Sequence, residues 1–180
     1  MKKILYLFAA VVLFSSCDDG EIVIENLNFA NSKITSCVNT PTGLLFKTNG
    51  QELLLIDVPA TLFDTAVSNA ADPKIYTLQP NQQEIIYRKY NGAVSSTTIC
   101  SLVPPSTPNV ADQWIGQPGG TIEVITSEVT NTNTTTGEVT RTGFSHVIRF
   151  KNVQLKNEQS SFVYEDYYFG EYIVNTTTTP

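Results

Sequence analysis

Few residues of this sequence have side chains that can act as a nucleophile, a general base or a soft metal ligand. The 180 residues include one histidine, His146, and three cysteines, Cys17, Cys37 and Cys100. A catalyst of the Ser/His/Asp or Cys/His type would have to use His146, and a metal site with two or more imidazole ligands is excluded. The elements that carry these four residues therefore decide which chemistry is open to the chain.

His146 falls in a stretch that alternates between apolar and polar residues. It shares its alternation with Phe144, Ile148 and Phe150. Alternate residues of a strand point to the same face, so His146 is expected on the apolar face. A half-buried, hydrogen-bonded histidine is the commoner outcome at such a position, and a catalytic histidine is the alternative. No nucleophile elbow, phosphate-binding loop or zinc-protease helix motif accompanies it.

Two pairs of carboxylates could in principle serve a glycan hydrolase. They are Glu165 with Asp166, and Glu123 with Glu128. Each pair is separated by an odd number of residues, which places the two side chains on opposite faces of a regular strand. The sequence also has no calcium-loop pattern. We therefore expect a protein that is not an enzyme and that holds no metal and no cofactor, with the hydrolase kept as an alternative.

Residues 1–16 have the pattern of a bacterial export signal. Lys2 and Lys3 precede the apolar run Ile4–Phe14, and two serines follow. The run is too short to cross a hydrocarbon core of about 30 Å, which needs about 20 residues, so cleavage is expected instead of a permanent span. Cys17 comes directly after the serines and resembles the cysteine of a lipobox, which is acylated and becomes the new N-terminus. The resemblance implies that a lipid at Cys17 anchors the protein to a membrane.

Residues 17–21 form a short acidic tether that includes Asp18, Asp19 and Glu21. An Asp directly after the lipidated cysteine resembles the inner-membrane retention signal of enteric bacteria, and a solvated linker is a further interpretation. Together with the Asn- and Thr-rich chain that follows, however, the tether resembles small lipoproteins of the Bacteroidota type. In those proteins, acidic residues at this place accompany surface display. This resemblance implies an outer-membrane lipoprotein on the cell surface or the periplasmic face.

Cys37 and Cys100 remain as a pair once Cys17 carries lipid. An exported protein passes into an oxidising compartment, so a disulfide between them is the economical prediction. Two buried free thiols are one alternative. A nucleophilic or metal-binding thiol is another, although neither cysteine has a CxxC partner or a neighbouring histidine.

Strand signals and turn residues alternate throughout the mature chain, which predicts an all-β fold: a single antiparallel β-sandwich over residues 22–175. Leu53–Ile56 is apolar throughout and predicts a strand buried on both faces. Thr126–Thr142 predicts a long Thr/Asn-rich hairpin that projects beyond the core. Ala60–Ala71 is the one candidate helix. Residues 176–180 are expected to form a frayed tail.

The aromatic residues are the leading candidates for a binding surface. Trp114 and the alternating residues Tyr164, Tyr168 and Tyr172 could stack on a sugar or bind a partner protein, and core packing is the alternative. In addition, Asp64-Thr65-Ala66 resembles the short O-glycosylation motif of exported Bacteroidota proteins, which makes Thr65 a candidate modification site.

The composition limits the choice of partners. A net charge of −6 argues against nucleic acid, and loss of Lys2 and Lys3 with the signal makes the mature chain more acidic. We expect a non-enzymatic, lipid-anchored binding or accessory module of the cell envelope, whose partners are the membrane and a glycan or an envelope protein. An adhesive or fimbrial subunit that assembles by strand exchange is a further alternative.

Overall fold

The computed structural model describes residues 26–37 and 43–175. Several predictions lie outside these described residues. They are the signal at 1–16, the lipidation of Cys17, the tether at 17–21 and the tail at 176–180.

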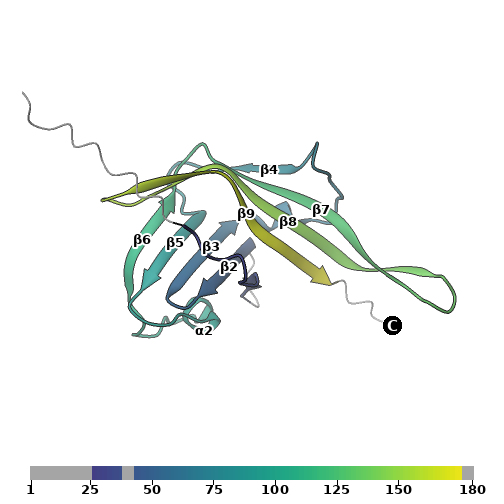
Figure 1. Ribbon diagram of the computed structural model, residues 1–180, viewed down its shortest axis with the longest axis horizontal. Helices are drawn as coiled ribbons and strands as arrows, with labels where there is room; N and C mark the ends of the chain where they lie inside the picture. The colour runs from purple at the N-terminus through teal and green to yellow at the C-terminus, as the bar shows by residue number, and fades with distance from the viewer. Residues whose placement is uncertain (1–25, 38–42, 176–180) are drawn as a thin grey trace, which may run out of the picture.

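The described chain forms nine antiparallel strands in one continuous sheet, which confirms the all-β prediction (Figure 1). The hydrogen-bonded order is β1-β2-β3-β5-β6-β8-β7-β4, and β9 pairs with the other side of β8. The strands are β1 (Thr35–Ser36), β2 (Gly43–Asn49), β3 (Glu52–Val58), β4 (Lys74–Thr77), β5 (Ile85–Tyr90), β6 (Val110–Gly116), β7 (Thr121–Thr132), β8 (Val139–Lys156) and β9 (Ser161–Asn175). Two short helices, η2 (Ala60–Phe63) and α2 (Ser96–Cys100), lie between them.

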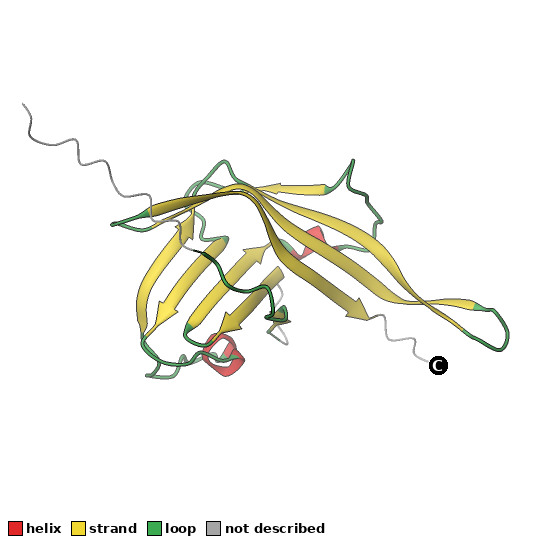
Figure 2. Ribbon diagram, viewed as in Figure 1, coloured by secondary structure: helices red, strands yellow, loops and turns green. Residues whose placement is uncertain are grey.

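The sheet folds into two layers at a short junction between β6 and β8. Only Ile115 and Gly116 of β6 pair with β8, opposite Lys156 and Leu155. Strands β1, β2, β3, β5 and β6 form one layer, and β4, β7, β8 and β9 form the other, which crosses the first (Figure 2). This is the antiparallel sandwich that the strand pattern predicts.

Apolar side chains from both layers fill the space between them and form the main core. The segment before β1 also contributes, since Leu27 and Phe29 are buried there. The removal of this apolar surface from water is the main source of stability in such a fold. Typical members are Leu54, Ile85 and Tyr87 of the first layer and Ile122, Ile148 and Phe150 of the second.

Strand β3 is buried on both faces, as its apolar run predicts. Leu54 and Ile56 face the main core, whereas Leu53 and Leu55 face a second cluster on the outer side of the first layer. Ile99 of α2 packs against that second cluster. The short helix and the loops around it therefore cover the outer face of β3.

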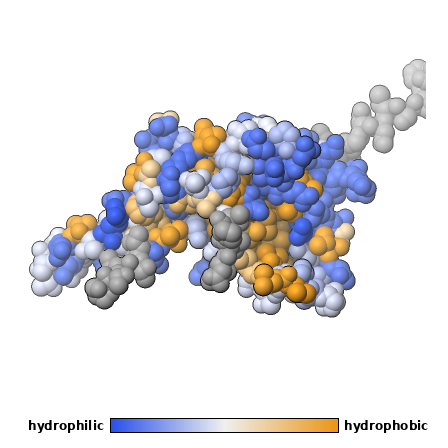
Figure 3. All heavy atoms as spheres, turned by 180° about the vertical axis from the view of Figure 1, so that it is seen from behind, coloured by the Kyte–Doolittle hydropathy of each residue, from blue (hydrophilic) through white to orange (hydrophobic). Residues whose placement is uncertain are grey.

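The hairpin between β7 and β8 projects beyond the sandwich, in agreement with the prediction (Figure 1). Gly137 has a φ of 75°, and the Asn133 side chain accepts hydrogen bonds from the backbone N–H groups of Thr135 and Thr136. These contacts fix a tight, polar turn. Seen from behind, the projecting end is largely hydrophilic or neutral (Figure 3).

The predicted helix over Ala60–Ala71 is wrong beyond its first turn. Only Ala60–Phe63 is helical, as a 3-10 turn. The Asp64 side chain accepts a hydrogen bond from the Ala66 N–H, which satisfies that donor within a turn instead of a continuing helix. Val67, in the part of the segment that is not helical, is exposed.

Candidate functional site

Cys37 and Cys100 lie at disulfide distance, as predicted, and the structure joins them. Their Cα atoms are 5.4 Å apart, and 63 positions separate them in the sequence. Cys100 ends α2, whose first turn is held by a capping box between Ser95 and Thr98. The bond ties this helix to the segment that follows β1, beside the second cluster.

His146 lies on the apolar face and is hydrogen-bonded, as expected, but it is fully buried and not half-buried. It is 1% exposed, and its Nδ1 lies 3.0 Å from the hydroxyl of Thr126. The rings of Phe63 and Tyr172 pack against the imidazole. Burial lowers the pKa of His146 below its ordinary 6.5, and Lys74 lowers it further, while Asp64 acts in the opposite direction. The imidazole is therefore held in its neutral form, in a packed interior.

This environment predicts that stability falls in mild acid. Because the folded-state pKa of His146 is lower than the unfolded value, the unfolded chain binds the proton more readily. The contribution of His146 is therefore complete above about pH 6.5 and is lost as the pH falls from there through the folded-state pKa. Urea unfolding between pH 7 and 5 should show this loss, and His146→Gln should flatten the profile. An equally steep profile in the variant would contradict the assignment.

Trp114 is not part of an exposed binding face, which corrects the prediction. It is 5% exposed, its ring stacks on Tyr87 with centroids 5.1 Å apart, and its Nε1 donates to the Ser160 hydroxyl at 2.9 Å. Trp114 pairs with Tyr87 across β5 and β6, so both rings point into the main core. Core packing, the alternative interpretation, applies to this residue.

Tyr164, Tyr168 and Tyr172 do not share a face either. Tyr168 is 51% exposed, whereas Tyr164 and Tyr172 pack against the main core. Two irregularities change the alternation along β9. Asn152, opposite this strand in β8, has a φ of 52°, and the register shifts beside Gly170. Tyr168 is therefore the exposed member of the three, whereas Tyr164 and Tyr172 are partly buried.

Tyr168 lies in a charged patch on the outer side of β8 and β9. The Arg149 guanidinium lies 5.8 Å from its ring centroid, and Asp166 pairs with Arg149 at 2.8 Å and with Lys151 at 2.9 Å. The hydrogen bond from Lys151, with that from Arg149, lowers the pKa of Asp166. A general acid of a glycan hydrolase needs the opposite shift. Asp166 is thus suited to an ion pair and not to proton donation.

Thr65 is exposed on the turn that follows η2. The neighbouring Asp64 carboxylate pairs with Lys74 and accepts the Ala66 N–H at 2.8 Å. The hydroxyl of Thr65 is thus accessible for modification, and its glycosylation stays a prediction.

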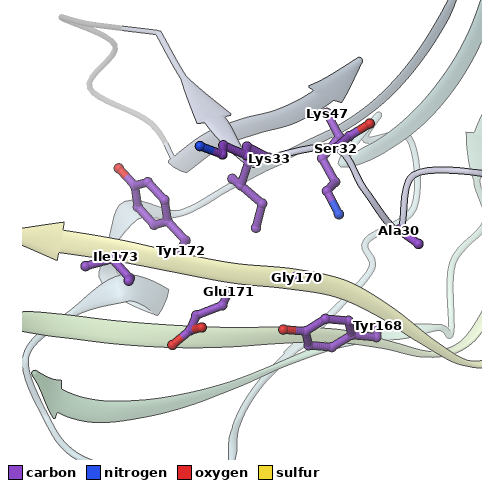
Figure 4. Close-up of a pocket in the computed structure, with 10 residues that line it drawn as sticks. Ala30, Ser32, Lys33, Lys47, Tyr168, Gly170, Glu171, Tyr172 and Ile173 are labelled. Atoms are coloured by element: carbon purple, nitrogen blue, oxygen red, sulfur yellow. The ribbon is translucent and has the colours of Figure 1, made fainter. Parts of the chain in front are cut away.

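Lys47 is a candidate site residue that was not predicted from the sequence. It lines a groove of about 390 Å³ between the segment Ala30–Ile34 and the β9 residues from Tyr168 to Ile173 (Figure 4). We call this the edge groove. Lys47 is 4% exposed, its Nζ donates to the carbonyl oxygen of Phe169 at 2.7 Å, and burial lowers the pKa of its amine.

A signal for Lys47 does exist in the sequence. It is two residues after Leu45, so strand alternation places both on the inward face of β2. A lysine at such a position is unusual, because a buried ammonium normally needs a partner of opposite charge.

Together these features define an all-β domain with a disulfide on one layer and a groove at the edge of the other. Comparison with protein-family models, curated proteins and solved structures finds no match. Within the described ranges, no helix has the length and apolar character needed to cross a membrane.

Proposed function

We propose that this protein is an exported lipoprotein anchored through Cys17, and that its β domain is a non-enzymatic binding module at the outer membrane. The partner would be an envelope protein or a glycan. The export signal and the lipobox-like cysteine would direct the chain to the envelope, and the β domain is the folded module that the lipid would hold near the membrane.

The crosslink between Cys37 and Cys100 is the observation that carries the proposal of export. Disulfides persist in oxidising compartments. In the cytosol, by contrast, thiols are kept reduced. A bond over 63 positions that ties α2 to the first layer suits such a compartment. It is independent of the signal pattern in residues 1–16, so two separate features favour the same destination.

The edge groove supports binding as the role of the exported domain. It combines a buried amine, Lys47, with the open side of a long strand, and both are features that a ligand can complete. The hydrolase alternative has less support, because Asp166 and Glu128 are both engaged by basic side chains on exposed faces.

Replacement of the lipidation residue tests the anchor. Cys17→Ala in the full precursor should move the protein from the membrane fraction to the soluble fraction, since a lipid could no longer be attached. Ser16→Ala is the matched control, because it keeps a small residue before the cysteine and should leave fractionation unchanged. The two fractions are compared by immunoblot after ultracentrifugation. Retention of Cys17→Ala in membranes would contradict the proposal.

A further inference from the structure

Strand β9 has an open edge. It is 15 residues long, and in the described part of the chain it pairs only with β8. A Cβ atom at Gly170 would lie 2.9 Å from the Ile34 side chain and 3.4 Å from the Lys47 amine, so these two residues cover one face of the strand there. Beyond Gly170, the residues Glu171–Ile173 line the edge groove without a second strand partner. Such an edge can accept the backbone of an extended chain.

The positive charge of Lys47 is not balanced locally. Its Nζ has one hydrogen-bond acceptor in the described residues, the neutral Phe169 carbonyl, and no described carboxylate lies within 4.0 Å of it. Glu171 lines the same groove, and its carboxylate accepts a hydrogen bond from the Ser145 hydroxyl instead of pairing with Lys47. In Figure 4, Lys47 reaches toward β9 from one side of the strand, and Glu171 projects from the other. Lys33, exposed on the same groove, adds a second positive charge.

We propose that the edge groove binds an extended acidic peptide of a partner protein, whose carboxylate pairs with Lys47 while its backbone lies along Glu171–Ile173. A carboxylate would give the buried ammonium the charged partner that it lacks. The open edge of β9 would accept backbone hydrogen bonds from the peptide and donate to it. This inference rests on the proposed function, because it names the class of partner that the exported module would bind.

The apolar part of the groove lining, which lies beside the hydroxyl-bearing Ser32, Tyr168 and Tyr172, suits the side chains of a peptide. Ala30, Ile34 and Ile173 present apolar surface beside the two lysines. Alternate side chains of a strand can pack on such surface, whereas a sugar ring needs many side-chain hydrogen-bond partners for its hydroxyls.

A titration of the purified full chain in detergent tests the proposal. Two fluorescent nine-residue peptides of alternating valine and threonine are used, one with a central aspartate and one with asparagine in its place. Binding is measured by fluorescence anisotropy. The aspartate peptide should bind at least about tenfold more tightly, which corresponds to about 1.4 kcal/mol. Lys47→Met should remove this difference, and Lys156→Met, which changes the same charge outside the groove, should preserve it.

A second variant keeps the test valid if Lys47→Met fails to fold. Lys33→Glu reverses an exposed charge on the groove and should weaken the aspartate peptide several-fold, while Lys156→Glu should not. Absence of binding, equal binding of both peptides, or unchanged binding in the Lys47→Met and Lys33→Glu variants would overturn the proposal. The proposal would also be overturned if a hexuronic acid oligosaccharide displaced the labelled peptide as effectively as the unlabelled acidic peptide does. Peptide binding and the membrane fractionation of Cys17→Ala are independent measurements. The proposal of a peptide site can therefore fail while the proposal of a lipid anchor stands, and the reverse also holds.

Discussion

Phe150→Ala is expected to lower the free energy of unfolding by about 3 to 5 kcal/mol. The Phe150 ring is fully buried in the main core, where it stacks on Phe169 with centroids 5.3 Å apart and lies 5.5 Å from the Tyr167 ring. The substitution removes these contacts and leaves a cavity between the two layers. Guanidinium unfolding followed by circular dichroism would measure the loss.

Val139→Ala is the matched control for that substitution. Val139 is exposed at the start of β8, in the projecting hairpin, so its truncation should change stability by less than about 0.5 kcal/mol. Phe150→Leu should cost less than Phe150→Ala, because it keeps most of the apolar volume. A loss below about 1 kcal/mol for Phe150→Ala would contradict the packing of the two layers around this residue.

Removal of the disulfide has the second large expected effect. The double variant Cys37→Ala/Cys100→Ala should be about 4 kcal/mol less stable, since the bond restricts an unfolded loop over 63 positions. Loss of the restraint should also loosen α2 over the second cluster. Unfolding is measured with and without dithiothreitol. The reductant should destabilise the unmodified protein to the level of the double variant and leave the double variant unchanged.

An unmodified protein whose stability is insensitive to the reductant would contradict a stabilising crosslink. Alkylation of the denatured protein gives an independent check, because Cys37 and Cys100 should resist modification until they are reduced.

Sequence periodicity predicted the fold well wherever the strands are regular. The alternation around His146 predicted an imidazole on the apolar face, and the continuous apolar run of β3 predicted a strand covered on both faces. The Thr/Asn-rich segment predicted a projecting hairpin. In each case the local pattern and the tertiary packing agree, and in the hairpin this holds although the register of β7 and β8 shifts between Val129 and Thr130.

The prediction that Tyr164, Tyr168 and Tyr172 share a face is wrong because strict alternation of faces does not hold in an irregular strand. Asn152 adopts a left-handed conformation, and the register shifts beside Gly170, so Tyr164 and Tyr172 turn inward while Tyr168 stays outside. The prediction that Trp114 lies on a binding face is wrong for a different reason. Its burial depends on the strand pairing that sets it opposite Tyr87, and a single sequence does not reveal pairing.

The edge groove could be predicted only in part. The inward position of Lys47 follows from its spacing to Leu45, but the groove needs β9 to pass beside the segment Ala30–Ile34, far away in the sequence. The hydrogen bond from Lys47 to Phe169 spans 122 positions. Long-range contacts of this kind are set by the fold as a whole and leave no local pattern.

Intact mass spectrometry of the protein extracted from membranes is the decisive measurement for an exported, lipid-anchored and crosslinked chain. We expect a chain that begins at Cys17, carries the mass of acyl groups, and gains two hydrogens on reduction because Cys37 and Cys100 are bonded. A chain that begins at Met1, without lipid and with free thiols at Cys37 and Cys100, would contradict all three properties.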